Sequence, residues 1–191
     1  MARRRLRSKT EQQLFRLCCL ALLCAMQIVF ARFLVIPVGD SMRFSLSFIP
    51  VVIAARYFGI LGSVAVYGLG DFLGAIIFPT GGAFQIGFTV TAAVSGLIYG
   101  IFLGKECEKP LRKLFSFDNK DIIRIFLSVF TSQLVCSLFL NSFWLSFYYG
   151  APFWAKFVMR IPQAGIMSVL QIAFMVLFLD KICNALRKAG V

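Results

Sequence analysis

The sequence predicts an all-α integral membrane protein, a bundle of six transmembrane helices with both termini in the cytoplasm. Hydrophobic residues make up 60% of its 191 positions, far above the share in soluble domains. They gather in runs, several of which are long enough to cross a hydrocarbon core of roughly 30 Å. Basic residues concentrate between alternate runs, which is the pattern that orients membrane proteins.

Turn residues and charges divide residues 1–191, predicted to be a single membrane domain, into six apolar segments after a basic tail of residues 1–12. A basic start before an apolar run is also typical of a signal peptide, but this run continues to Ile36 without a small-x-small cleavage site. Pro79, Gly81 and Gly82 mark a tight reversal between the third and fourth segments. The predicted helices cover about residues 13–36, 44–56, 60–78, 84–103, 122–147 and 153–179.

The second segment is short and contains Pro50, so by length it could be re-entrant rather than spanning. The distribution of positive charge favours a crossing. If the segment crosses, 16 of the 20 basic residues lie on the side of the termini, whereas otherwise the split is 8 against 12. The 16 residues predicted to be cytoplasmic are Arg3, Arg4, Arg5, Arg7, Lys9, Arg16, Arg56, Lys105, Lys109, Arg112, Lys113, Lys120, Arg124, Lys181, Arg187 and Lys188.

Composition also bears on which classes of function are compatible with the chain. Histidine is absent, which removes the commonest general base and metal ligand. The six cysteines form no C-x-x-C pair, and they are expected to be small hydrophobic side chains in helices. The net charge of +12 reflects topology rather than a nucleic-acid surface. We therefore expect neither catalysis, nor a metal site, nor a cofactor, nor a nucleic-acid partner.

Polar residues lie among aromatic ones around the reversal between the third and fourth segments. Asp71, Gln85 and Thr89 are interspersed with phenylalanines that include Phe84 and Phe88. Polar groups at membrane depth are costly and usually face a cavity or a partner. Aromatic rings combined with a few hydrogen-bonding groups suit a flat, mostly apolar ligand with polar edges.

The remaining four basic residues are predicted to lie on the outer side, where positive charge is usually scarce. They are Arg32, Arg43, Lys156 and Arg160. Their side chains could reach the outer headgroups. However, an arginine at depth costs roughly 2.5–3.5 kcal/mol on insertion scales. Because guanidinium groups pair carboxylates in a bidentate manner, a site for an anion would explain that cost.

Two residues, Trp144 and Asp71, have two interpretations each. Asn141 and Trp144 are three apart and share one helical face, and Trp144 is either a ligand contact or an aromatic anchor at the outer interface. Asp71 could accept two hydrogen bonds from an amino-pyrimidine edge, or it could pair with an arginine for structural reasons.

The first predicted helix carries a small-x-x-x-small motif, Ala21 and Ala25, that lets another helix approach closely. This face could dock a membrane partner, or it could pack inside the bundle. Such motifs are frequent by chance, so the sequence leaves both possibilities open.

Five motifs and one arginine follow one another along the chain: RFSLSFIP at 43–50, GDFLGA at 70–75, FPTGGAF at 78–84, GFT at 87–89, NSFW at 141–144 and Arg160. In this order they resemble the substrate-binding S component of an energy-coupling factor (ECF) vitamin transporter, and the folate-specific branch in particular. The resemblance implies a vitamin site on the extracellular side and docking of the Ala21–Ala25 face on a transmembrane T component. That partner is driven by two cytoplasmic ATPases, and this chain has no phosphate-binding loop of its own.

The resemblance implies folate or a reduced folate as substrate, which fits the residues. The candidate binding residues are Arg32, Arg43, Asp71, Phe84, Gln85, Phe88, Thr89, Asn141, Trp144 and Arg160. Aromatic members could stack on rings, polar ones could pair the pterin edges, and arginines could bind the carboxylates. The alternatives are an S component for another vitamin or nucleobase-like ligand, and a membrane scaffold protein that binds no small molecule. In either transport interpretation, we expect a multi-pass protein of the bacterial plasma membrane.

Overall fold

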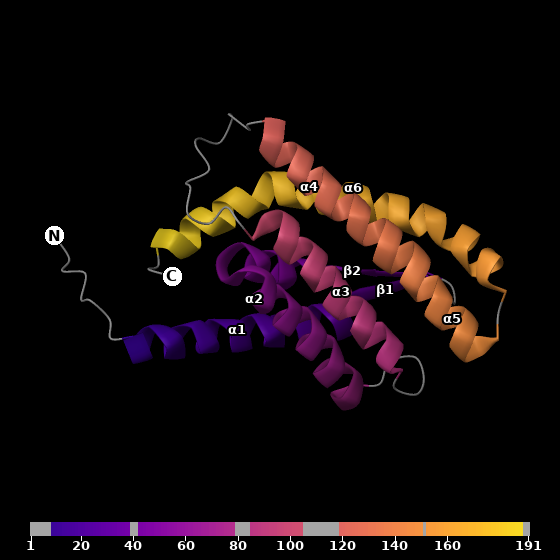
Figure 1. Ribbon diagram of the computed structural model, residues 1–191, viewed down its shortest axis with the longest axis horizontal. Coiled ribbons are helices and arrows are strands. Elements are labelled where there is room, and N and C mark those ends of the chain that lie inside the picture. Colours follow the sequence, from indigo (N-terminus) through magenta and orange to yellow (C-terminus); the bar gives the residue numbers. More distant parts are fainter. Residues whose placement is uncertain (1–8, 39–41, 79–84, 105–118, 151, 189–191) are drawn as a thin grey trace.

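The computed structural model describes residues 9–38, 42–78, 85–104, 119–150 and 152–188, which form an elongated bundle of helices (Figure 1). Helices α4 and α6 lie along one side, α1 lies along the other, and α2, α3 and a β-hairpin lie between them. The elements are α1 (Lys9–Arg32), β1 (Val35–Val38), β2 (Met42–Ser45), α2 (Phe48–Ile77), α3 (Ile86–Leu103), α4 (Asn119–Ser132), the π-helical segment η1 (Gln133–Leu140), α5 (Asn141–Tyr149) and α6 (Phe153–Lys188).

Within the described residues, five helical stretches are long and apolar enough to cross a membrane. Their outward faces carry many exposed leucine, isoleucine and phenylalanine side chains, as expected for helices whose solvent is lipid. The prediction of a helical membrane bundle is therefore confirmed. The five stretches are Gln13–Arg32, Phe48–Ile77, Ile86–Leu103, Ile122–Tyr149 and Phe153–Leu177.

The segment between the first two predicted helices corrects the sequence analysis, because it forms a two-stranded antiparallel sheet. The first helix ends at Arg32 instead of Ile36, and α2 begins at Phe48 instead of residue 44. Strands β1 and β2 pair Val35 with Ser45 and Val38 with Met42. The β-branched residues and the proline in β1 favour an extended chain over a helix. The apolar character of this stretch had extended both predicted helices into it.

Helix α2 has two arms separated by Gly59, whose φ of 67° and ψ of −154° are not helical. These arms, residues 48–58 and 60–77, correspond to the second and third predicted helices. Glycines bring the second arm close to α1, because a Cβ at Gly62 would lie 3.4 Å from Leu20 and one at Gly74 would lie 3.1 Å from Arg32. The second arm and α1 therefore run in the same direction. It follows that the first arm returns the chain toward the level of Leu20.

Helices α2 and α3 pack so closely that a side chain on either of two α3 glycines would collide with α2. A Cβ at Gly96 would lie 2.7 Å from the carbonyl oxygen of Ser63, and one at Gly100 would lie 2.6 Å from the Cα of Ile60. Small residues allow such contacts between membrane helices, where dispersion replaces the hydrophobic effect as the source of attraction.

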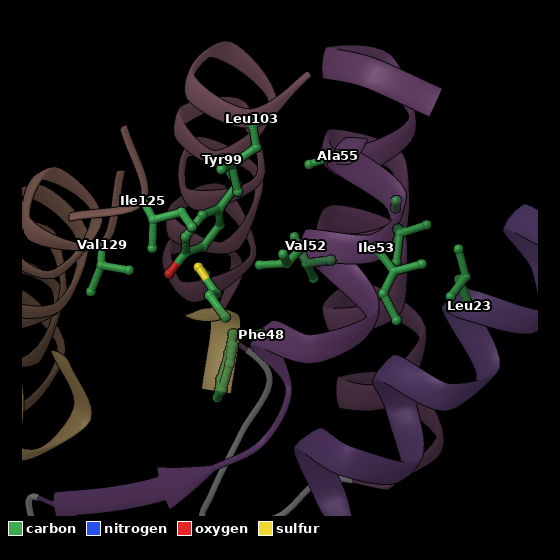
Figure 2. Close-up of a cluster of buried hydrophobic side chains, with 13 residues drawn as sticks. Leu23, Phe48, Val52, Ile53, Ala55, Tyr99, Leu103, Ile125 and Val129 are labelled. Atoms are coloured by element: carbon green, nitrogen blue, oxygen red, sulfur yellow. The ribbon is translucent and has the colours of Figure 1, made fainter. Parts of the chain in front are cut away.

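The core lies where α2, α3, α4 and α6 meet. Figure 2 shows Phe48 and Val52 of α2 facing Tyr99 of α3, with side chains of α4 beyond. The Tyr99 hydroxyl donates to Gln171 Oε1 of α6 at 3.1 Å. Gln133 Nε2 donates to the same oxygen at 3.2 Å. These bonds pair polar groups that would otherwise be costly inside the bundle.

The fifth predicted helix, about residues 122–147, is a longer run in which α4, η1 and α5 follow without interruption. The N–H of Asn141 bonds the carbonyl oxygen of Cys136, five residues earlier, which is the π-helical pattern. Helix α5 ends at Tyr149 and is capped by Gly150, which has a φ of 63°. Helix α6 continues past the predicted end at residue 179 and tolerates Pro162 within it.

Candidate functional site

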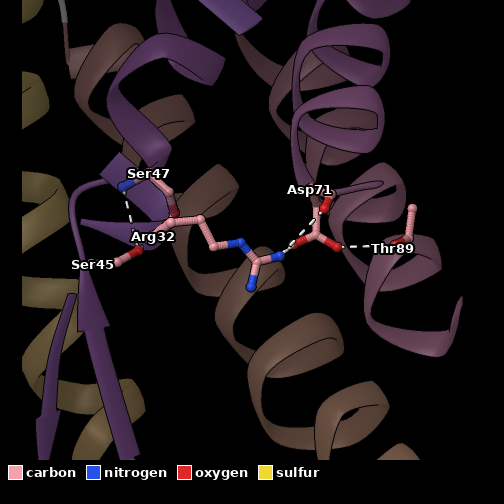
Figure 3. Close-up of polar contacts among 5 residues, drawn as sticks. All are labelled: Arg32, Ser45, Ser47, Asp71 and Thr89. Atoms are coloured by element: carbon pink, nitrogen blue, oxygen red, sulfur yellow. Dashed lines mark hydrogen bonds and ion pairs between the residues drawn. The ribbon is translucent and has the colours of Figure 1, made fainter. Parts of the chain in front are cut away.

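Three of the sequence-predicted site residues, one each from α1, α2 and α3, lie together (Figure 3). Arg32 Nη2 of α1 lies 3.4 Å from Asp71 Oδ1 of α2, and it also donates to the Asp71 carbonyl oxygen at 3.3 Å. Thr89 of α3 donates its hydroxyl to Asp71 Oδ2 at 3.0 Å. Each carboxylate oxygen of Asp71 therefore has a donor from this chain. We call Arg32, Asp71 and Thr89 the three-helix cluster.

The sequence around the three-helix cluster explains why it forms. Arg32 is the last residue of α1, so its long side chain can extend sideways across α2. Gly74 leaves room for it, since a Cβ there would lie 3.1 Å from Arg32 Nε. The side chains of Arg32 and Asp71 are only 12% and 22% exposed. Pairing offsets the cost of holding each charge at this depth, which is the structural interpretation that the sequence left open for Asp71.

Gln85 lies at the start of α3 without capping it. It occupies the N-cap position with extended backbone angles, yet its side chain makes no capping hydrogen bond. Its Oε1 atom is buried and has no hydrogen-bond partner among the described residues. A buried acceptor without a donor is unusual in a folded protein and indicates a missing partner.

Trp144 of α5 lies against the backbone of Gly87, near the start of α3. A Cβ at Gly87 would come closest to Trp144 Cδ2, and it would lie 2.6 Å from Cε3 and 2.7 Å from Cε2. Cδ2 is bonded to three other ring atoms, so it can be approached only through a face of the ring. Gly87 therefore covers one face of the indole. The Trp144 Nε1 atom is buried, with no hydrogen-bond partner among the described residues.

The neighbouring residues of α5 and α6 add further polar groups. Ser142 is fully buried, and its hydroxyl also has no partner within the described part of the chain. Asn141 is partly buried at the start of α5. On α6, which packs against α5, Arg160 and Gln163 retain 8% and 5% exposure. The packed pair α5 and α6 thus carries a buried charged side chain, one buried amide and one partly buried amide.

Two sequence-predicted site residues cannot be placed as side chains. The backbone of Arg43 lies in β2, where it pairs with Pro37, but its side chain is outside the described set. Phe84 lies outside the described residues, as does the reversal at 79–84. Phe88 is partly buried on α3, next to Thr89.

The Ala21–Ala25 face of α1 is exposed in the structure. Helix α1 packs against α2 through other residues, such as the buried Gln27, whose side chain a Cβ at Gly70 would meet at 2.5 Å. Ala21 and Ala25 are therefore available for contact with another helix in the bilayer.

Sequence reasoning missed three contributors to the site. Gly74, Gly87 and Ser142 stand inside the GDFLGA, GFT and NSFW motifs, but none of them was assigned a role in the site. The missing signal is spatial, because nothing in the sequence says which side chain lies above a glycine. Among the described residues, no group of three His, Cys, Asp or Glu side chains could hold a metal ion.

Comparison with known proteins identifies the family. Residues 15–179 match the family described as ECF transporter, substrate-specific component. The chain is 33% identical over 150 residues to the folate transporter FolT of Clostridium novyi, with 78% of each chain covered. It is 30% identical over 153 residues to the folate transporter FolT of Leuconostoc mesenteroides, covering 79% of this chain and 75% of the relative.

Solved structures agree with these matches. A crystal structure of FolT bound with folic acid is similar with a TM-score of 0.71 and 26% identity, over 86% of this chain and 92% of that one. The S-component for biotin from an ECF-type ABC transporter has a TM-score of 0.63 over 95% of both chains. At 19% identity, that second likeness concerns the fold alone. The chain belongs to the family of substrate-specific components, or S components, of ECF transporters.

Proposed function

We propose that this chain is a folate-binding S component, which captures folate or a reduced folate on the extracellular side and delivers it to the cytoplasm. The observation that carries the proposal is a set of buried polar atoms around the start of α3 and on α5 that have no partner within the described part of the chain: Gln85 Oε1, Trp144 Nε1 and Ser142 Oγ. They comprise an acceptor, a donor and a hydroxyl, so a ligand with both kinds of group on its edges would pair them.

Membership of the family settles the class of protein. S components are multi-pass membrane proteins that bind a transported substrate, so the chain is a transport subunit and not an enzyme. In ECF systems, partner subunits hydrolyse the ATP.

Folate matches the chemistry of the site in three parts. Its pterin ring carries donors and acceptors along its edges, for which Gln85 and Trp144 offer an acceptor and a donor. Its aromatic body suits a partly apolar surface such as the one that Phe88 provides. Its glutamate carries two carboxylates, and the buried guanidinium of Arg160 suits one of them. The two relatives called folate transporters and the folic-acid complex support this choice of vitamin.

The same proposal includes six crossings with both termini in the cytoplasm. Support comes from the parallel arrangement of α1 and the second arm of α2, which requires the first arm to return the chain between them. That arm, residues 48–58, extends roughly 16 Å at the helical rise, which is about half the hydrocarbon thickness. The hairpin β1–β2 then lies at the outer side, where β2 packs against α6.

Transport requires partners, and we propose that the Ala21–Ala25 face docks on the transmembrane T component. Both residues are exposed and stand one turn apart on α1, and small residues permit the close backbone approach that stabilises helix pairs in lipid. The ATPases then act through the T component and not through this chain.

Equilibrium binding to the purified protein tests the ligand assignment. We expect radiolabelled folate to bind saturably in detergent without ATP, and a reduced folate to compete with it, whereas thiamine and biotin should not. Mass spectrometry of the small molecules that copurify provides an independent check. If a different vitamin copurifies, the chain is an S component for that vitamin and not for folate. The absence of any saturable ligand would favour the scaffold alternative.

A further inference from the structure

The proposed folate site contains a tryptophan whose ring face is already in contact with the protein. Gly87 covers one face of Trp144. The ring of Tyr148, one turn later on α5, lies nearly parallel to the indole, with 5.9 Å between centroids and 26° between planes. Phe143 and Phe147 contact the indole at steeper angles, 71° and 85°. The indole is thus fixed within an aromatic group and against a backbone.

The edge of the same ring carries a buried hydrogen-bond donor, Nε1–H, that has no acceptor among the described residues. Nε1–H is the only polar group of tryptophan and can only donate. It is buried and has no partner among the described residues, although a buried indole N–H normally finds one. Gln85, two residues before Gly87, presents the complementary case of a buried acceptor without a donor.

We propose that Trp144 recognises the ligand as a hydrogen-bond donor through Nε1 rather than as a stacking surface, and that Gly87 is the positioning residue that holds the indole in this orientation. The inference rests on the proposed folate site. The ligand group would be an acceptor on a heteroaromatic ring edge, such as the carbonyl oxygen or a ring nitrogen of a pterin. Stacking the pterin on the Gly87 side would instead require Trp144 to leave that backbone.

Nuclear magnetic resonance of the indole tests the proposal directly. The chain has two tryptophans, and Trp154 is 72% exposed on α6, so Trp154→Phe leaves one indole N–H signal and should bind folate with unchanged affinity. On saturation with folate, we expect the Trp144 Nε1–H signal to shift and its exchange with water to slow at least about tenfold, as for a newly protected donor. The pterin C7 proton should show no large upfield shift.

The outcomes separate this inference from the proposed function. If the Trp154→Phe protein binds folate but the indole signal neither shifts nor becomes protected, Trp144 is not a donor to the ligand, while the folate assignment stands. An upfield shift of the pterin proton would instead demonstrate stacking and overturn the inference. If calorimetry detects no folate binding at all, the proposed function itself fails.

Two substitutions provide a second measurement. Trp144→Phe retains an aromatic ring but removes the donor, and we expect folate affinity to fall roughly tenfold, the scale of one hydrogen bond in a buried site. Gly87→Ala retains the donor but displaces the ring, so it should weaken folate binding and also move the indole signal in the ligand-free protein. Unchanged affinity in a folded Trp144→Phe protein, judged by its elution as a single species, would refute the donor role.

Discussion

The three-helix cluster predicts a strong energetic coupling between Arg32 and Asp71. At the 3.4 Å that separates Arg32 Nη2 from Asp71 Oδ1, two unit charges attract by about 5 kcal/mol at an effective dielectric constant of about 20. The side chains are 12% and 22% exposed, so solvent screens part of this attraction, and the cost of desolvating both ions opposes it. We expect a net coupling of about 2–3 kcal/mol.

The perturbation is a double-mutant cycle with Arg32→Met and Asp71→Asn. Each single substitution removes the opposite charge from beside the remaining charged residue at membrane depth, so each should lower the unfolding temperature by roughly 5–10 °C for a chain of this size. The double substitution removes both charges and should cost little more than either single one. Thermal unfolding in detergent, followed by the loss of the folded species in size-exclusion chromatography, measures all four proteins.

The matched control is Arg16→Met, which removes a charge from an exposed position on the same helix. It should change the unfolding temperature by no more than about 2 °C, because surface charges contribute little. If the losses in unfolding temperature from the two single substitutions add up in the double variant, Arg32 and Asp71 do not act as a pair. Their contact would then contribute nothing measurable to stability.

Three further predictions concern the ligand, the partner and the topology. Arg160→Ala should weaken folate binding by about 1.5–3 kcal/mol, as for a charged hydrogen bond, with little effect on pteroate, which lacks the glutamate; equal losses for both ligands in equilibrium binding would make Arg160 structural. Ala21→Trp should abolish copurification with the T component while folate affinity stays unchanged, whereas Val169→Trp, at an exposed position of α6, should spare both; lost affinity with the partner still bound would contradict docking. In a cysteine-free background, an impermeant maleimide should label Tyr149→Cys but not Ile123→Cys in intact cells, since these exposed positions lie toward opposite ends of the run from α4 to α5; labelling of Ile123→Cys would reverse the topology.

Much of the fold follows from the sequence, because the bilayer imposes simple rules on composition. A span must be apolar over a fixed length, and positive charge must lie mainly on one side. These rules found the helical segments, including the two arms of α2 on either side of Gly59. They also found the exposed Ala21–Ala25 face, because the spacing of small residues can be seen along one helix.

The tertiary structure alone decided what the polar residues contact. Asp71 and Arg32 are 39 positions apart, and their hydrogen bond depends on how α1 packs on α2 at Gly74. The contact between Gly87 and Trp144 joins residues 57 positions apart in the chain. The hairpin β1–β2 also escaped prediction, because hydropathy does not distinguish an apolar strand from the end of a membrane helix. The local sequence determines which segments enter the membrane. The pairing of polar side chains instead depends on contacts between segments that are far apart in the chain.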